Sequence, residues 1–329
     1  MTKKEKRNIH LEITTALVSS IEALPEDDIN WMRSWGLVNT RPVSKATGKA
    51  YKGINWFILS IMQQLHGYAS NEWGTFNYWF KAGGGEREGK TVTKESRYSV
   101  KGQKGTQVVL YKRLTKEETN TTTGKKEDKS FMLMKSFTVF NADQVEGYEA
   151  PPLADIPAEQ PATIVDPIAE AMGIKLVHAD LNRCFYRPSD DTANTPPATQ
   201  FKTIADYICA NFHEFGHGTG HKSRLDRDLK NHFGDDAYAF EELVAELFAA
   251  MLAGQFGVSA TPREDHTHYL KGWMRRIKED EKALFKAVAA AQKAVDWANE
   301  AIEGADDMVL WAQKRGLPTA VIDALAEAA

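Results

Sequence analysis

The sequence predicts an α+β protein of two domains, in which an N-terminal α+β domain precedes a mainly helical C-terminal domain. The chain has 329 residues, of which 42% are hydrophobic and 26% charged, as in globular proteins long enough for two cores. Helix-like and strand-like segments mix in the first half, whereas the second half shows mostly helical periodicity. Between them, APPLADIPAEQPATIVD (residues 150–166) contains four prolines, which is typical of an extended linker. We therefore expect domains at residues 1–150 and 167–329, joined by a linker at residues 151–166.

In the N-terminal half, apolar residues at helical spacing predict helices, and runs of β-branched and aromatic residues predict strands. The expected helices are residues 8–24, 53–67 and 74–81, and the expected strands are residues 106–113 and 131–140. Between these strands, LTKEETNTTTGKKEDKS (residues 114–130) is too polar to pack and predicts a mobile hairpin loop or a family insertion.

The C-terminal half shows two amphipathic helices followed by further helical segments. Residues 203–215 carry Ile204, Ile208, Phe212 and Phe215 at helical spacing, and residues 238–256 repeat the pattern with a wide apolar face. The later segments, at residues 268–282, 283–304 and 318–328, are expected to pack over the first two.

The first of these helices ends in HEFGH, an HExxH motif at residues 213–217. His213 and His217 are four residues apart and share a helix face, so both imidazoles can reach one tetrahedral Zn²⁺. Zn²⁺ lowers the pKa of water, Glu214 can accept the released proton, and the resulting hydroxide attacks an amide carbon. The motif therefore predicts peptide-bond hydrolysis with Glu214 as the general base. The alternative is a helix with an ordinary solvated polar face.

Such a site needs a third protein ligand, and one candidate is His221, four residues after His217. Gly218 and Gly220 are expected to end the helix before His221, which weakens this candidate.

The other candidates are Glu241, Glu242 and Glu246 on the following helix. Glu242 and Glu246 lie opposite the apolar face, beside small alanines such as Ala245 that permit close helix approach. We choose Glu242 as the metal ligand and Glu246 as a carboxylate that accepts an imidazole N–H. The alternative is that both face water. Zn²⁺ is the default metal for two histidines and a glutamate, but Mn²⁺ or Co²⁺ could occupy the same ligands.

The charge of the chain is distributed unevenly. Residues 1–150 contain 23 Lys+Arg and 17 Asp+Glu, a net charge of +6, whereas the remainder contains 18 and 28, a net charge of −10. Residues 31–80 also hold five of the eight tryptophans. Basic charge interleaved with aromatic rings is typical of a surface for single-stranded nucleic acid, although each ring alone is more often a core residue. The candidate contacts are Lys49, Tyr51, Lys52, Trp73, Lys101, Lys104, Lys112 and Arg113.

Two features favour a cytoplasmic protein. Cys184 and Cys209 have no paired spacing, which suits a reducing compartment and two structural thiols. The basic N-terminus could pass for the start of a signal peptide, but Glu12 and Glu22 interrupt the segment after it, and no apolar stretch of membrane-spanning length appears.

Several blocks of the sequence resemble the ArdC-type antirestriction proteins of conjugative plasmids and phages. They are SKATGKAYKGINWFIL (44–59), KGQKGTQVVLYK (101–112), SFTVFNADQVEG (136–147), HEFGHGTGHKSRLDR (213–227), EELVAELFAAML (241–252) and YLKGWMRRIKED (269–280). The resemblance implies an N-terminal single-stranded-DNA-binding domain and a C-terminal zincin-like metallopeptidase domain that help a mobile element escape host restriction. It places the family's HExxH on His213, Glu214 and His217, and its downstream glutamate on Glu242. Residues 85–100 depart from the family pattern and look like an insertion.

These features support three hypotheses. The chain binds single-stranded DNA and carries a peptidase site, with a host restriction or regulatory protein as its possible substrate. Alternatively, the metal site is structural and DNA binding alone blocks restriction. In the third, the chain is a regulatory protease that cleaves a repressor or restriction subunit and has no real DNA affinity.

Overall fold

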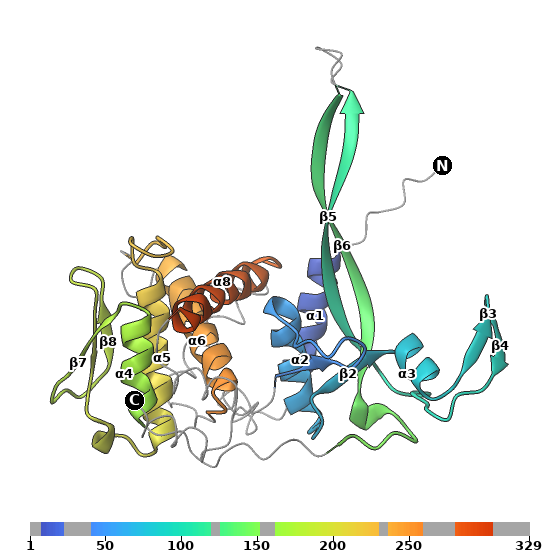
Figure 1. The fold of residues 1–329 in the computed structure, drawn as a ribbon, viewed down its shortest axis with the longest axis horizontal. Helices are drawn as coiled ribbons and strands as arrows, with labels where there is room; N and C mark the ends of the chain where they lie inside the picture. Colours follow the sequence, from blue (N-terminus) through green and yellow to red (C-terminus); the bar gives the residue numbers. More distant parts are fainter. Residues whose placement is uncertain are drawn as a thin grey trace. The chain divides into compact units, whose positions relative to one another are not determined.

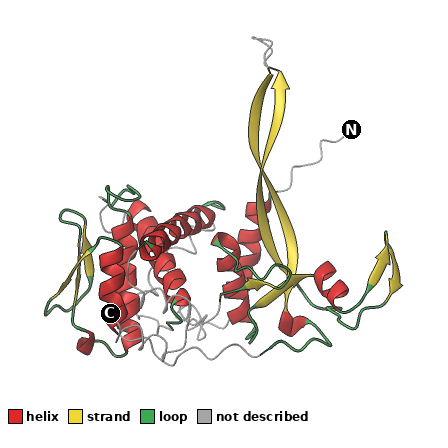
Figure 2. Cartoon of the chain, viewed as in Figure 1, coloured by secondary structure: helices red, strands yellow, loops and turns green. Residues whose placement is uncertain are grey.

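A computed structural model describes residues 8–22, 41–119, 126–151, 162–229, 236–258 and 280–304 (Figure 1). The chain divides into two compact units, the first comprising residues 1–17 and 42–151 and the second residues 18–41 and 152–329. Each unit contains both helices and strands (Figure 2), which confirms the predicted α+β class. Of the predicted late helices, residues 318–328 and most of 268–282 lie outside the described residues.

The first unit is built on a four-stranded sheet with the order β1–β2–β6–β5. β1 (Val43–Ser44) pairs in parallel with β2 (Glu72–Thr75), whereas β2 with β6 (Lys126–Asn141) and β6 with β5 (Thr106–Thr119) are antiparallel pairs. β5 and β6 form one long hairpin whose far half extends beyond the rest of the sheet (Figure 1).

The hairpin corrects the prediction of a loop at residues 114–130. The register is unbroken from Thr106 opposite Val139 to Thr119 opposite Lys126, so strand pairing covers most of the polar segment. The prediction was wrong because a strand ladder is held by main-chain hydrogen bonds and cross-strand pairs, and does not require a core on either face. The ion pair between Lys126 and Glu117, at 2.8 Å, is one such cross-strand contact.

Helices contribute buried residues to the first unit. α1 (Ile9–Glu22), α2 (Gly53–Leu65) and α3 (Phe76–Ala82) match the three predicted helices within two residues at each end. Their buried residues include Leu17, Leu59 and Trp79. α1 belongs to this unit as far as Leu17. Asn55 of α2 pairs with the outer edge of β5, because its side chain donates to the Val109 carbonyl at 2.7 Å and accepts from the Val109 amide at 2.8 Å.

Two smaller elements complete the first unit. β3 (Glu86–Glu88) and β4 (Thr91–Lys94) form a separate two-stranded hairpin from the segment that departs from the family pattern. A 3₁₀ turn, η2 (Ala142–Gln144), follows β6 and is held by a capping box between Asn141 and Gln144.

The second unit begins with elements that were not predicted from the sequence. η3 (Ala162–Ile164) and α4 (Val165–Ala171) occupy the end of the predicted linker, because Ile164, Val165 and Ile168 are buried core residues. Three short strands follow in the order β7–β9–β8, with β7 (Lys175–His178) parallel and β8 (Phe185–Arg187) antiparallel to β9 (Thr192–Thr195). A 3₁₀ turn, η4 (Ala198–Gln200), leads to the long helices.

Three long helices form the core of the second unit. α5 (Ile204–Thr219) packs against α6 (Asp236–Gln255), and α6 packs against α8 (Ala283–Glu303), as the yellow, orange and red ribbons of Figure 1 show. The side chains of Phe212, Phe215, Phe248 and Phe256 are fully buried there. Among the described residues, no helix has both the length and the apolar character needed to cross a bilayer.

Candidate metal centre

α5 carries the HExxH motif in its last two turns. The helix begins after Thr203, whose hydroxyl accepts a hydrogen bond from the amide of Asp206 at 3.0 Å, and ends at Thr219 with Gly220 as its C-cap. An N-cap threonine of this kind fixes the start of the helix. Because the helix continues through His217, the two histidines of the motif lie one turn apart on the same face.

α5 and α6 approach closely at Gly216, the fourth residue of the motif. A Cβ atom placed on Gly216 would lie 2.8 Å from Cα and 3.2 Å from Cβ of Ala245 on α6. The 2.8 Å contact with a backbone atom is shorter than real Cβ contacts, so a side chain at this position would force the helices to shift, and glycine permits the close approach. The contact brings the glutamates of α6 within reach of the histidines of α5.

His213, His217 and Glu242 come together between the two helices as a group that could hold a metal ion. The two Nε2 atoms of the histidines are 3.1 Å apart, and the Glu242 carboxylate oxygens lie 3.5 Å from each of them. Ligand atoms about 2.1 Å from a tetrahedral ion lie about 3.4 Å from one another. The two 3.5 Å separations involve different oxygens of Glu242, Oε2 toward His213 and Oε1 toward His217. One ligand atom from each of the three residues lies within 4.8 Å of the others, so the group can close around a single ion. Glu214, also on α5, is 6% exposed.

A further carboxylate stands behind each histidine. Oε1 of Glu246 lies 2.9 Å from Nδ1 of His213, and Oε1 of Glu241 lies 3.4 Å from Nδ1 of His217. In both rings, Nδ1 thus faces a carboxylate and Nε2 faces the group that includes Glu242. This arrangement is typical of metal-ligating histidines, whose second nitrogen donates to an outer carboxylate.

The electrostatics of the site favour a cation. Burial alone would raise the pKa of Glu242, but hydrogen bonding to His213 and the charges of both histidines hold this pKa at about 2. Burial alone would lower the pKa of His213, but Glu246, Glu242 and Glu214 outweigh it and raise the pKa well above its usual value. The same negative surroundings that stabilise a protonated histidine would stabilise a divalent ion.

Tyr238 also belongs to this site, although no role was predicted for it. Its side chain hydrogen-bonds the Glu242 carboxylate and contributes to the low pKa of that group. Tyr238 precedes Glu242 by four residues on α6, a spacing that places two side chains side by side.

Arg227 was also missed by sequence reasoning. Its guanidinium forms a two-point ion pair with Glu241, with Nη2 at 2.7 Å from Oε1 and Nε at 2.9 Å from Oε2. Arg227 follows the motif in a loop ten residues after His217, and no helical or strand periodicity relates such a position to α6. The folded loop is what brings it to Glu241.

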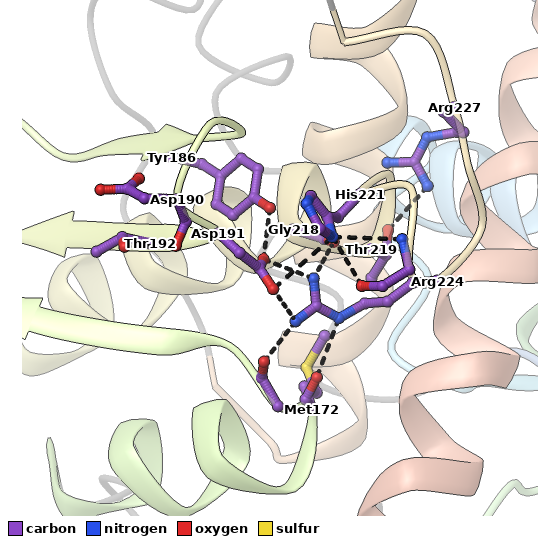
Figure 3. Close-up of polar contacts among 12 residues, drawn as sticks. Met172, Tyr186, Asp190, Asp191, Thr192, Gly218, Thr219, His221, Arg224 and Arg227 are labelled. Atoms are coloured by element: carbon purple, nitrogen blue, oxygen red, sulfur yellow. Dashed lines mark hydrogen bonds and ion pairs between the residues drawn. The ribbon is translucent and has the colours of Figure 1, made fainter.

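His221 lies outside the metal group. Its Nδ1 atom is 2.7 Å from the Ser223 hydroxyl and 3.8 Å from Asp191, among the polar contacts around Arg224 shown in Figure 3. Arg224 makes a two-point ion pair with Asp191, at 2.7 and 2.9 Å, and donates to the carbonyls of Met172 and Gly218. Asp191 thereby ties the β8–β9 turn to the end of α5.

Comparison with known proteins assigns both halves of the chain to families. Residues 7–140 match the model of the N-terminal domain of the anti-restriction factor ArdC, and residues 163–291 match that of a zincin-like metallopeptidase. The crystal structure of the metal-free antirestriction ArdC protein from plasmid R388 is 33% identical, with a TM-score of 0.67 over 90% of this chain and 98% of that one.

The chain belongs to the ArdC antirestriction family. A Mn(II)-bound structure of the same R388 ArdC protein matches at 31% identity with a TM-score of 0.66, over 90% of this chain and 98% of that one. An uncharacterized Sinorhizobium fredii protein, y4eC, is 32% identical over 90% of this chain and 93% of its own length. DNA primase TraC of Escherichia coli is 33% identical over 89% of this chain, which spans only 27% of the length of TraC.

The structure places most of the predicted DNA contacts of this ArdC-family chain on the surface of the first unit. The exposed residues are Lys49, Lys52, Lys101, Lys104 and Lys112, and Tyr51 is half-buried. The assignment of Trp73 was wrong, because its side chain is 0% exposed in the core and cannot stack on a base. The side chain of Arg113 lies outside the described part of the structure.

Proposed function

We propose that this ArdC-family protein is a divalent-metal-dependent peptidase that also binds single-stranded DNA. The observation that carries the first part is the gathering of His213, His217 and Glu242, which each offer one ligand atom within 4.8 Å of the others. Two imidazole nitrogens and a carboxylate are a common ligand set for a catalytic divalent ion. The zincin-like family model supports the same chemistry.

In this proposal His213, His217 and Glu242 hold the ion, and Glu246 holds the imidazole of His213 in orientation. A divalent ion in such a site supplies Lewis acidity, which polarises an amide carbonyl and makes water easier to deprotonate. Glu214 accepts the proton of the attacking water and returns it to the leaving amine, as a buried carboxylate beside the ligands can do. Zn²⁺ is the expected metal, and Mn²⁺ and Co²⁺ are compatible with the same nitrogen and oxygen donors.

The first unit is proposed to bind single-stranded DNA. The match to the ArdC N-terminal domain, the net charge of +6 over residues 1–150 and the exposed Lys101 and Lys104 support this proposal. Lysines on a surface neutralise phosphates regardless of base sequence. A host restriction or regulatory protein, met in the cytoplasm on or near incoming DNA, is the proposed peptidase substrate.

Replacement of Glu214 by glutamine tests the peptidase proposal. Because Glu214 is not a ligand in this scheme, the Glu214→Gln variant should retain the metal content of the wild type and lose proteolysis of the natural target together with antirestriction. Antirestriction at the wild-type level with full metal content would show that the metal site serves a structural role in that activity.

Binding to short oligonucleotides at several salt concentrations tests the DNA proposal. Affinity for single strands should fall steeply as salt rises, and replacing Lys101 and Lys104 together by alanine should reduce the slope by about 1.4, or about 0.7 per lost phosphate contact. A chain that shows no salt-sensitive binding to single strands would be a protease without DNA affinity.

A further inference from the structure

We propose that Arg227 is a positioning residue of the metal site, acting through Glu241 on the ligand His217. This inference rests on the proposed metal site. It adds two contacts, from Arg227 to Glu241 and from Glu241 to His217, and a third that attaches Arg227 to α5. Because none of these three contacts involves the ion, they can be tested by measuring metal binding to the folded protein.

The first link is the two-point ion pair between the guanidinium of Arg227 and the carboxylate of Glu241. Arg227 donates Nη2–H to Oε1 of Glu241 at 2.7 Å and Nε–H to Oε2 at 2.9 Å. Two parallel charge-assisted bonds of this length fix both the position and the plane of the carboxylate. The side chains are 13% and 9% exposed, so water competes little for these bonds.

The second link is between Glu241 and His217. The Oε1 atom that accepts from Arg227 is also the atom 3.4 Å from Nδ1 of His217. A carboxylate held at Nδ1 orients the ring so that Nε2 points to the opposite side, where Nε2 of His213 lies 3.1 Å away and Oε1 of Glu242 3.5 Å away.

The third link attaches Arg227 to the helix that carries the ligand. Nη2 also donates to the Gly216 carbonyl at 2.8 Å, and Nη1 donates to the Thr219 hydroxyl at 2.8 Å. The Thr219 hydroxyl in turn donates to the Gly216 carbonyl at 2.6 Å. The same guanidinium therefore joins the last turn of α5, on which His217 stands, to the carboxylate of α6 that orients His217.

A lysine cannot reproduce these contacts. The ammonium group is a single point with three donors, whereas Arg227 uses all three nitrogens of a planar fork on partners in different directions. Arg227→Lys therefore keeps the positive charge at this position but no longer holds the Glu241 carboxylate in a fixed orientation.

Arg224 provides a matched control. It lies in the same loop, is 6% exposed, forms its own fork with Asp191 and donates to the Gly218 carbonyl of α5. The two arginines differ in their carboxylate partners, because Glu241 contacts His217 whereas Asp191 contacts neither His213 nor His217. Arg224→Lys should therefore cause a similar loss of stability from a broken two-point ion pair, without disturbing His217.

The experiment uses the full chain, stripped of metal with a chelator. The affinity for Zn²⁺ is measured by competition titration, and the visible absorption of bound Co²⁺ reports the ligand geometry. Arg227→Lys and Glu241→Gln should each weaken Zn²⁺ binding about 10-fold to 100-fold and alter the Co²⁺ spectrum, as other losses of outer carboxylate support do. The double variant should be hardly weaker than either single variant, because both changes break the same chain of contacts. Arg224→Lys should stay within about twofold of the wild type by the same scale.

Circular dichroism establishes whether each variant is folded. If Arg227→Lys does not fold, Glu241→Gln alone is used to test the inference. Wild-type Zn²⁺ affinity and Co²⁺ spectrum in either folded variant would overturn the inference and leave the metal site standing. Losses that add in the double variant, or an equal loss in Arg224→Lys, would also overturn it. A wild-type chain that binds no divalent ion would overturn both the inference and the proposed function.

Discussion

Gly216 sets the distance between α5 and α6, and adding one methyl group there tests the geometry of the whole site. A Cβ on this residue would lie 2.8 Å from Cα, 3.1 Å from the carbonyl oxygen and 3.2 Å from Cβ of Ala245. Two of these three atoms belong to the backbone of α6, so no side-chain rotation can relieve the contact. The Gly216→Ala variant must therefore move one helix away from the other.

The size of the movement can be worked out from ordinary contact distances. Carbon atoms in contact lie about 3.5–4.0 Å apart, so the helices must separate by about 0.7 Å or more. His213 and His217 are on one helix and Glu242 is on the other, so the closest distance from each imidazole to the carboxylate would grow from 3.5 Å to about 4.2 Å. Ligand atoms of one tetrahedral ion lie about 3.4 Å apart, so Glu242 would be drawn away from the ligand position. Overpacking costs about 1–3 kcal/mol, and the gain in helix propensity from alanine offsets about 1 kcal/mol of it. We expect a modest loss of stability and at least a tenfold loss of metal affinity, by the scale of other disturbed sites.

The assay compares Gly216→Ala with Gly218→Ala in urea unfolding and in Zn²⁺ titration. A Cβ on Gly218 would meet the flexible end of the Ile174 side chain at 2.6 Å, and its three nearest atoms belong to Ile174 and Tyr186, not to α6. Both variants gain the same helix propensity and one methyl group, but only Gly216→Ala should lose metal affinity. Wild-type affinity in Gly216→Ala, or an equal loss in both variants, would refute the claim that this helix contact positions the ligands.

Three further predictions concern the scaffold. Asn55→Ala should lower the free energy of unfolding by about 1–3 kcal/mol, because two hydrogen bonds to Val109 are lost, and an unchanged urea midpoint would contradict this. Trp73→Phe should reduce the free energy of unfolding by about 1–3 kcal/mol and leave oligonucleotide affinity unchanged, because Trp73 is a core residue. A loss of DNA binding without a loss of stability would contradict this. Burial opposes ionisation of Asp191, but hydrogen bonds from Arg224 and Tyr186 outweigh burial and lower the pKa of Asp191. The ionised carboxylate therefore stabilises the fold fully above the unfolded pKa of about 3.9, and this stabilisation is lost as the pH falls through the lower pKa of the folded state. Asp191→Asn should thus be less stable than the wild type near neutral pH, with the difference shrinking below about pH 4, and a constant difference across this range would argue against the ion pair.

The helices of the site are encoded in local sequence. Apolar spacing and the glycines after His217 predict α5, and the alanines of α6 predict a close helix contact, which the structure shows at Gly216 and Ala245. Glu242 and Glu246 could be placed opposite the apolar face of their helix because one helical period relates them. Periodicity is a property of a single segment, so it suffices for features within one helix.

Contacts that depend on tertiary folding were not visible in the sequence. Arg227 reaches Glu241 through a loop whose path has no period, and Asp191 reaches Arg224 from a strand turn in which it adopts a φ of 54°. Trp73 looked like a surface ring because it stands in a basic, aromatic stretch, but its strand places it in the core. The charge of a segment does not determine whether one of its side chains is buried or exposed.

The most direct test of the proposed metal centre is anomalous diffraction from crystals of the full chain soaked with Zn²⁺ or Mn²⁺. We predict one strong peak between α5 and α6, about 2.0–2.2 Å from Nε2 of His213, Nε2 of His217 and a carboxylate oxygen of Glu242, with Glu246 and Glu241 outside the coordination sphere. A peak coordinated by His221 or Glu246 in place of Glu242, or no peak at this position, would contradict this assignment.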